Sequence, residues 1–124
     1  MVNFQSDLPL YELSLVQSLV RTGAFTLANS RARTSASELG WDSVMLMDFV
    51  CALKKKHFHR RYPKTKAFDG RKEFDTDGYK MRFNEDDRRE GTSTDLMFWI
   101  KIAIEDLGTN ERVAIVSFHL DGQP

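Results

Sequence analysis

Basic and histidine side chains gather in one short stretch of the sequence, LKKKHFHRRYPKTK at residues 53–66, called the basic segment below. It holds seven of the chain's 18 Lys and Arg residues and two of its three His residues. Lys and Arg attract phosphate, and imidazole can accept or donate a proton near neutral pH. This combination is typical of a surface that binds nucleic acid and could act on it chemically. A block of like charge is also commonly a solvated face, so charge alone leaves both interpretations open.

A second set of reactive side chains lies on three segments with alternating polarity, at residues 78–84, 96–105 and 112–120. This period predicts β-strands, whose successive side chains point to opposite faces of a sheet. The side chains expected to face the core are Tyr79, Met81, Phe83, Phe98, Ile100, Ile102, Ile104, Ala114, Val116, Phe118 and Leu120. Those expected on the opposite face are Lys80, Arg82, Trp99, Lys101, Val113, Ile115, Ser117 and His119. That face would be a platform of cations, one indole and one imidazole, with the basic segment as a wall.

The first half of the chain must supply the elements that cover this sheet, and its apolar residues recur at helical spacing. The pattern predicts a helix between Pro9 and Gly23, a short helix that starts at Ser35, and a third that begins after Asp42 as N-cap. Residues 24–27 are too few to assign firmly, and a brief strand is one interpretation. Helices followed by strands indicate an α+β fold, and we expect residues 1–124 to form a single domain.

The composition limits the class of protein. The chain has 124 residues, 41% of them apolar, and no formal net charge, which is ordinary for a soluble globular domain. No apolar run approaches a membrane span and the N-terminus lacks a signal-peptide pattern, so we expect a cytoplasmic protein with no membrane partner. The single cysteine, Cys51, excludes an internal disulfide. His57 and His59 lack Cys or acidic neighbours at ligand spacing, so we expect no metal and no cofactor.

Five stretches carry a family resemblance: YELSLVQSLVRTG, SASELGWDSVMLMDFVCAL, DGYK, WIKI and VAIVSFH. In this order and spacing, over residues 11–119, the chain resembles the MqsR (motility quorum-sensing regulator) type toxins of bacterial toxin–antitoxin systems. The resemblance implies a RelE-like fold, with N-terminal helices packed on one face of a mainly antiparallel C-terminal sheet. It also implies metal-independent cleavage of messenger RNA, and a cognate antitoxin with a zinc-binding N-terminal part and a DNA-binding C-terminal part.

The positions that match the family's site residues differ in type here. The family lysine after the third helix falls at Arg60, with Lys56 close enough to substitute. A family glutamine falls at Thr76, and a family tyrosine at the start of the WIKI strand is Trp99. A family lysine at the end of the last strand is His119. We expect the fold to tolerate these changes, whereas they alter the groups available for proton transfer.

Metal-independent RNA cleavage needs a base for the 2′-OH, an acid for the leaving oxygen, and cations around the phosphate. We expect His119 to act as acid or base, Arg60 and Lys101 to stabilise the phosphate, and Trp99 to stack on a nucleobase. The remaining residues expected to contact RNA are Lys56, His57, His59, Arg61, Lys80 and Arg82.

Each of these residues could instead have a purely structural or solvent-exposed role. His119 could be an exposed strand-end residue, Trp99 could pack under the C-terminal tail, and the lysines could be plain solvated strand residues. Two classes of function therefore remain: an endoribonuclease toxin, and a catalytically weak nucleic-acid-binding regulatory protein that lost activity when the tyrosine became Trp99. The acidic loop at residues 85–90 is explained by neither.

Overall fold

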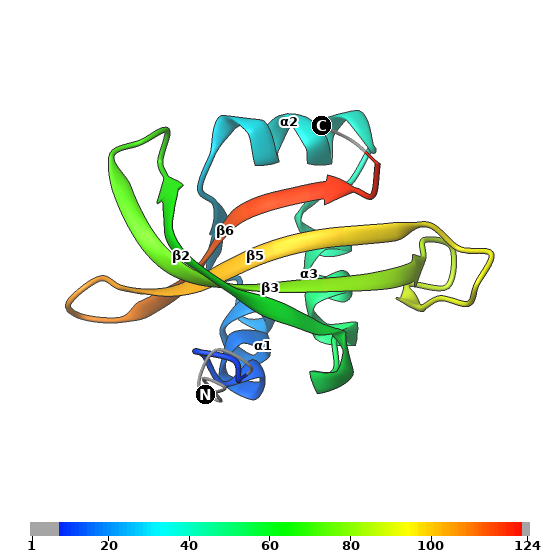
Figure 1. Ribbon diagram of the computed structural model, residues 1–124, viewed down its shortest axis with the longest axis horizontal. Coiled ribbons are helices and arrows are strands. Elements are labelled where there is room, and N and C mark those ends of the chain that lie inside the picture. The colour runs from blue at the N-terminus through cyan, green and yellow to red at the C-terminus, as the bar shows by residue number, and fades with distance from the viewer. Residues whose placement is uncertain (1–7, 123–124) are drawn as a thin grey trace, which may run out of the picture.

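The computed structural model describes residues 8–122 and has helices in the first half and strands in the second (Figure 1). Its elements are α1 Leu13–Arg21, β1 Phe25–Leu27, α2 Ser30–Glu38, α3 Ser43–Ala52, the 3₁₀ turn Lys55–His57, β2 Phe58–Ala67, β3 Lys72–Asn84, β4 Arg89–Glu90, β5 Met97–Asp106 and β6 Glu111–Leu120. The α+β prediction is confirmed. None of the helices within residues 8–122 has the length and apolarity needed to cross a membrane.

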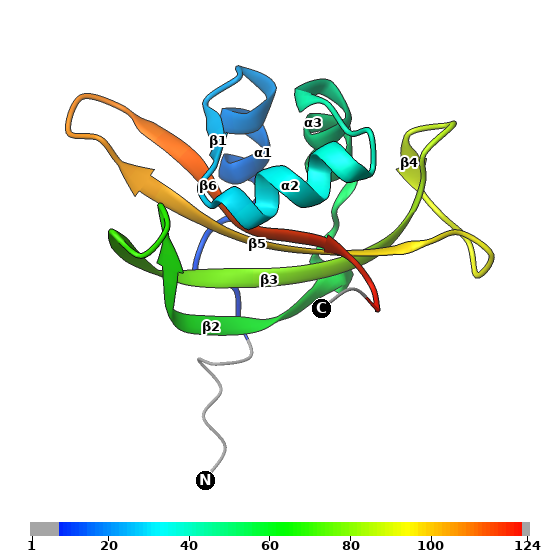
Figure 2. The ribbon, with the colours of Figure 1, turned by 90° about the horizontal axis from the view of Figure 1, so that it is seen from above.

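The strands form one six-stranded, mostly antiparallel sheet in the order β1-β6-β5-β3-β2, with β4 paired to β3. The brief strand β1 pairs with β6 in the parallel direction, and the other pairs are antiparallel. Figure 2 shows α1, α2 and α3 together on one side of this sheet. Within residues 8–122 the opposite side carries no helix, so the strands present their outward side chains there.

The helix boundaries follow the predicted signals in part. The third helix begins as predicted, because the Asp42 carboxylate accepts a hydrogen bond from the Met45 backbone N–H at 2.9 Å. The first helix starts only at Leu13, so Pro9 precedes it. The second helix starts at Ser30 rather than Ser35, and the prediction for its start was wrong.

The early start of α2 has a tertiary cause. The Asp69 carboxylate, from the turn after β2, accepts hydrogen bonds from the backbone N–H of Ser30 at 3.1 Å and from its hydroxyl at 3.0 Å. It therefore supplies the acceptor that a helix N-terminus needs. Because Asp69 lies 39 residues after Ser30, the sequence near the helix start does not reveal this cap. The nearby capping pattern at Ser35 therefore gave the wrong start for α2.

The core between the helices and the sheet is organised around an aromatic cluster. Trp41 lies at its centre, with ring centroids 4.7 Å from Phe98, 4.9 Å from Phe118, and 5.5 Å from both Phe49 and Phe83. Offset and tilted aromatic pairs contribute about 0.5–1.5 kcal/mol each beyond the area that they bury. This cluster fixes β3, β5 and β6 against α3, and so fixes the outward faces of those strands as well.

The predicted faces of β3 and β5 are confirmed, because their apolar side chains belong to the helix-side core. The prediction for β6 was half wrong. Phe118 and Leu120 do pack on the helix side, but so do Val113 and Ile115, whereas Ala114 and Val116 are buried in a second cluster.

The cause is a β-bulge in β6. Lys101 pairs with Ser117 and Ile102 pairs with Ile115, so Val116 is an extra residue in the ladder. An extra residue reverses the alternation of the side chains on one strand. As a result Ser117 and His119 lie on the helix-free face, as predicted, although the first half of β6 has the opposite phase from the one predicted.

Candidate nucleic-acid interface

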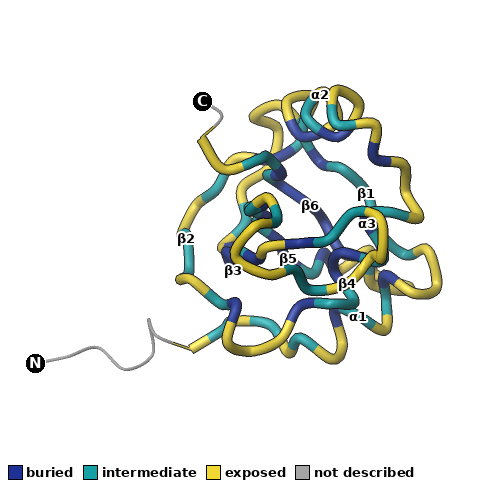
Figure 3. Tube along the Cα trace, turned by 90° about the vertical axis from the view of Figure 1, so that its right-hand side faces the viewer, coloured by how far each residue is buried: buried dark blue, intermediate teal, exposed yellow. Residues whose placement is uncertain are grey.

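The helix-free side of the sheet carries the cluster of side chains that we call the open face: His59, Arg60, Tyr62, Lys80, Trp99, Lys101, Ser117 and His119. The strand register brings them together. Lys80, Trp99 and His119 lie in one row across β3, β5 and β6. Lys101 and Ser117 form the next row with Gly78. β2 borders these rows, and Figure 3 shows it as half-buried and exposed, in contrast to the buried central strands.

Trp99 lies between two imidazole rings. Its ring centroid is 5.0 Å from His59, which meets it edge-on, and 6.4 Å from His119, whose plane is within 2° of parallel. The Lys80 ammonium stands 5.1 Å from the Trp99 ring centroid. The indole N–H donates to the Asp121 carboxylate at 2.9 Å, which fixes the ring against the C-terminal turn. The indole is thus held in place, with its polar atom already bonded.

Tyr62 organises the second row and was missed among the candidate residues. Its ring centroid lies 4.0 Å from the Lys101 ammonium and 4.6 Å from the central guanidinium carbon of Arg60. The ring lies directly over Gly78, where an added Cβ would come within 2.4 Å of it. The glycine therefore lets the aromatic ring cross the sheet and hold both cations. The available signal was an aromatic residue inside the basic segment, but that segment was not predicted to be a strand.

Cations on the open face lack anionic partners. Within residues 8–122, Arg60, Lys80 and Lys101 form no ion pair and no hydrogen bond through their side chains. Burial, followed by the positive charge of Arg60, lowers the pKa of Lys101. Unpaired like charges at close range raise the energy of the protein, and an anion that binds between them relieves it.

The two imidazoles of the open face are held neutral near pH 7. Burial, then the charge of Lys101, lowers the pKa of His119 below its ordinary value of 6.5, and the Asp121 carboxylate opposes this effect. Burial, then Lys80 and Arg60, lowers the pKa of His59. Neither ring nitrogen of His119 hydrogen-bonds to another residue in the described part of the chain. A neutral imidazole with a free nitrogen can accept a proton.

Two of the predicted RNA contacts lie at the start of the basic segment and are bound to an acid. Glu90 of β4 accepts from the Lys56 ammonium at 2.8 Å and from His57 Nε2 at 3.1 Å, and Lys54 contacts its other oxygen at 3.2 Å. His57 Nδ1 accepts from the Lys54 backbone N–H at 2.8 Å, so Nε2 carries the proton. These contacts lower the pKa of Glu90 to about 2. His57 and His59, the conceivable metal pair, thus have separate surroundings.

The guanidinium groups of Arg61 and Arg82 are also engaged. Arg61 donates to the backbone carbonyl of Leu8 at 2.7 Å, and Arg82 donates to that of Asp95 at 2.7 Å. Thr76, at the family's glutamine position, is fully buried and its hydroxyl hydrogen-bonds with that of Thr65 at 3.1 Å. Of the residues predicted to contact RNA, the structure brings His59 and Lys80 to the open face with Arg60, Trp99, Lys101 and His119.

The acidic loop at residues 85–90 binds to the helical side of the molecule. Glu85 accepts from the Trp41 indole N–H at 2.7 Å, and Arg88 pairs with Asp48 of α3 at 3.0 Å. Together with Glu90, these contacts tie the loop to the aromatic core, to α3 and to the first lysines of the basic segment. The loop therefore has a structural role, because it joins the sheet to the helices and to the start of the basic segment.

Comparison with known protein families places the chain in one of them. A family model described as "Motility quorum-sensing regulator, toxin of MqsA" covers residues 8–120. No curated protein and no solved structure matches the chain. The match spans all the elements described above and confirms the resemblance inferred from the five sequence stretches.

Proposed function

Because the chain belongs to the MqsR toxin family, the toxins of MqsA, we propose that it is an endoribonuclease that cleaves single-stranded messenger RNA without a metal and arrests growth when free of its antitoxin. The observation that carries this proposal is the open face itself. A neutral imidazole, His119, stands beside cations that have no carboxylate partner among residues 8–122. The cations of such a site can bind an anionic substrate, and its neutral imidazole can accept a proton from that substrate.

His119 is suited to start the reaction as the general base. Its lowered pKa keeps the imidazole neutral at physiological pH, so its unprotonated ring nitrogen can accept the proton of a 2′-hydroxyl. The 2′ oxygen then attacks the adjacent phosphorus, and the bond from phosphorus to the 5′ oxygen breaks. The products are a 2′,3′-cyclic phosphate and a free 5′-hydroxyl, so no water and no redox partner is consumed.

Lys101 is suited to complete the proton transfer. The leaving 5′ oxygen must gain a proton, and a lowered pKa makes the Lys101 ammonium a better donor than an ordinary lysine. Arg60 contacts the Tyr62 ring, as Lys101 does, and can bind the non-bridging phosphate oxygens where negative charge grows. A single preorganised donor of this kind is typically worth about 10²–10³-fold in rate.

Trp99 is suited to bind a nucleobase rather than to move protons. Its N–H is bonded to Asp121, and an indole has no proton to exchange near neutral pH. Stacking on an aromatic ring contributes about 1–3 kcal/mol per base for single strands. RNA is read largely in unpaired regions by such stacking, which supports a single-stranded substrate.

The family name supplies the expected inhibitor, an MqsA-type antitoxin. We expect it to be co-encoded and to have zinc-binding and DNA-binding parts. Expression of the chain alone should stop growth, and co-expression of the neighbouring small protein should restore it. Normal growth at high soluble levels of the free chain would contradict the proposal.

The direct test is cleavage of labelled single-stranded RNA by the purified protein in EDTA. We expect wild type to cut and His119→Ala to lose about 10²-fold or more in rate, as is typical of acid–base groups. Circular dichroism and thermal unfolding should show that the variant is folded. A loss of less than about tenfold would remove His119 from the mechanism. Binding that weakens with salt, with the RNA left intact by wild type, would instead favour the regulatory RNA-binding protein.

A further inference from the structure

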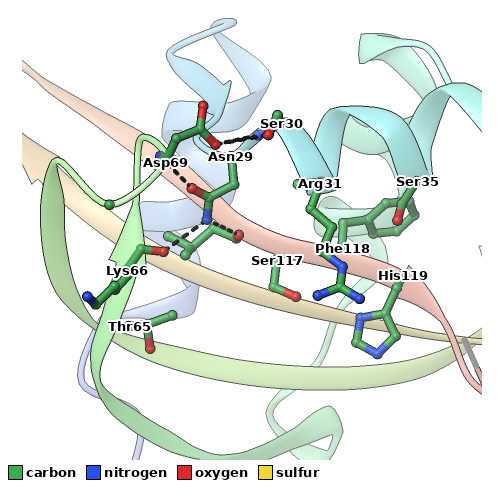
Figure 4. A pocket seen from close by; sticks show the side chains of 13 residues that line it. Asn29, Ser30, Arg31, Ser35, Thr65, Lys66, Asp69, Ser117, Phe118 and His119 are labelled. Atoms are coloured by element: carbon green, nitrogen blue, oxygen red, sulfur yellow. Dashed lines mark hydrogen bonds between the residues drawn. The ribbon is translucent and has the colours of Figure 1, made fainter. Parts of the chain in front are cut away.

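A cleft of ≈ 420 Å³ lies next to His119, between α2 and the adjoining parts of β2 and β6 (Figure 4). Its size is in the usual range for small-molecule sites. The polar residues that line it are Asn29, Ser30, Arg31, Ser35, Thr65, Lys66, Asp69, Ser117 and His119. The cleft shares Ser117 and His119 with the open face, so the two surfaces are continuous at β6.

A single amide side chain joins the walls of the cleft. The Asn29 Nδ2 group donates to the backbone carbonyl of Lys66 at 2.9 Å and to that of Val116 at 2.8 Å. Its Oδ1 atom accepts from the Asp69 backbone N–H at 3.0 Å. The start of α2 is therefore tied to β2, to the bulge of β6 and to the turn after β2. Because these bonds fix three segments together, the cleft is a preformed feature of the fold.

Two cations of the cleft are unpaired. Among residues 8–122, the side chains of Arg31 and Lys66 form no ion pair and no hydrogen bond. Figure 4 shows the Arg31 guanidinium and the His119 imidazole directed into the same space. Arg31 is also close enough to His119 to contribute, after burial and Lys101, to its lowered pKa. An additional cation, from α2, thus faces the imidazole.

The carboxylate in the cleft does not neutralise these cations. Asp69 accepts the two hydrogen bonds from Ser30 and lies 3.8 Å from the Arg33 guanidinium, so its charge is already matched. The same bonds occupy the N-terminus of α2, which is therefore not the anion site. The other lining groups are hydroxyls, among them Ser35, Thr65 and Ser117. Proteins commonly bind phosphate through cationic side chains and hydroxyl groups of this kind.

We infer that this cleft is a second phosphate subsite, in which Arg31 and Lys66 bind the backbone phosphate of the nucleotide next to the cleaved bond. The inference rests on the proposed function, because it assigns a path for the same RNA. The strand would cross the open face past Tyr62 and His119 and continue under α2. Arg31 then selects for substrates long enough to reach it, and it holds the RNA so that the scissile phosphate stays beside His119.

The test compares wild type with Arg31→Ala, Lys66→Ala and Arg21→Ala. Arg21 ends α1 and lines no part of the cleft, so its variant removes the same charge elsewhere. The probes are 2′-O-methyl oligoribonucleotides, a dinucleotide and an octanucleotide, which cannot undergo 2′-OH attack. Equilibrium binding is measured over a range of salt concentrations, and cleavage of the matching unmodified octanucleotide is measured in EDTA.

We expect Arg31→Ala to bind the octanucleotide about tenfold more weakly than wild type, with a smaller loss for Lys66→Ala. The slope of log affinity against log salt should fall by about 0.7, the value for one phosphate contact of a single strand. The loss should be smaller for the dinucleotide, and Arg21→Ala should match wild type.

The outcomes separate this inference from the proposed function. If wild type cleaves RNA but Arg31→Ala binds the octanucleotide with unchanged affinity and salt slope, the subsite is wrong and the ribonuclease proposal stands. An equal loss in Arg21→Ala would also overturn the subsite, because it would reflect net charge alone. If wild type neither binds nor cleaves RNA, both proposals fail.

Discussion

Two parts of the basic segment, its start and its middle, have opposite electrostatic surroundings. At its start, Lys54, Lys56 and His57 all contact one carboxylate, that of Glu90. Further along, Arg60 contacts the ring of Tyr62, and so does Lys101 from β5, with no acid between them. One run of sequence therefore contains two kinds of cation, one paired with a carboxylate and the other held only by an aromatic ring.

The difference shows how this fold separates cations that a carboxylate neutralises from cations that keep their charge. Where the chain provides a carboxylate, as at Glu90 and at buried Glu105 with Lys72 and Arg112, the cations fix one segment to another. Where it provides only an aromatic ring, the cations are positioned but not neutralised. A cation–π contact contributes about 0.5–2 kcal/mol and leaves the positive charge available to a phosphate.

The strongest test of this comparison is Lys101→Ala. We expect RNA cleavage to fall about 10²–10³-fold, because the variant removes a charge that faces the phosphate directly. Thermal unfolding should change by only a few degrees, since no carboxylate loses a partner. The charge-matched control is Lys54→Ala, which removes a cation bound to Glu90 at the start of the basic segment and should cleave as wild type does. Similar losses in both variants would abolish the distinction between the two regions.

Tyr62 tests whether the ring positions the cations. We expect Tyr62→Leu to reduce kcat/KM about tenfold, because Arg60 and Lys101 lose their shared support. Tyr62→Phe keeps the ring and should remain within about threefold of wild type. Steady-state cleavage of a fluorogenic RNA measures both. A severe defect in Tyr62→Phe would mean instead that the phenol hydroxyl itself takes part in the reaction.

The pH dependence of cleavage tests the state of His119. A general base must be neutral, so kcat/KM should rise with pH through the His119 pKa, which lies below 6.5. The Asp121 carboxylate raises this pKa, so Asp121→Asn should move the acidic limb to lower pH. Asparagine keeps an oxygen acceptor for the Trp99 N–H. Asp106→Asn, in a distant turn, is the control, and a limb that moves to higher pH in Asp121→Asn would contradict the assignment.

Glu90 should affect stability without reducing cleavage. Its folded pKa of about 2 lies below the ordinary value of 4.5, so its stabilising contribution is present above pH 4.5 and lost as the pH falls toward 2. Glu90→Gln should therefore unfold at a lower temperature than wild type at pH 7, and the difference should shrink in acid. The control is Asp86→Asn in the same loop. Loss of RNA cleavage in a folded Glu90→Gln protein would show that the paired lysines belong to the reactive surface.

Sequence patterns predicted the regular parts of this protein well. The alternation in β3 and β5 placed Tyr79 in the core and Trp99 and Lys101 on the other face, because nothing interrupts the pleat there. The helix cap at Asp42 was found because its partner is three residues away. Features of this kind depend on short-range chemistry, which a single sequence displays directly.

The features that escaped prediction depend on contacts between distant residues. The pairing of Lys56 with Glu90, the capping of α2 by Asp69 and the approach of Arg31 to His119 all join separate segments of the chain. The sequence of the basic segment therefore does not show which of its cations are paired with a carboxylate. Tyr62 was missed for the same reason, since its importance comes from Gly78 on the neighbouring strand.

The extra residue at Val116 has a consequence for the whole reactive surface. Upstream of it, odd-numbered side chains of β6 point toward the helices; downstream, even-numbered ones do. The alternation of the side chains in β6 therefore changes phase at this residue. A homologue without Val116 would pair this strand in regular alternation and still keep the Phe118 ring inside and the His119 imidazole outside, whereas a chain that kept the residue but lost the bulge would reverse both. The bulge, as much as the identity of the side chain at position 119, decides whether an imidazole reaches the open face.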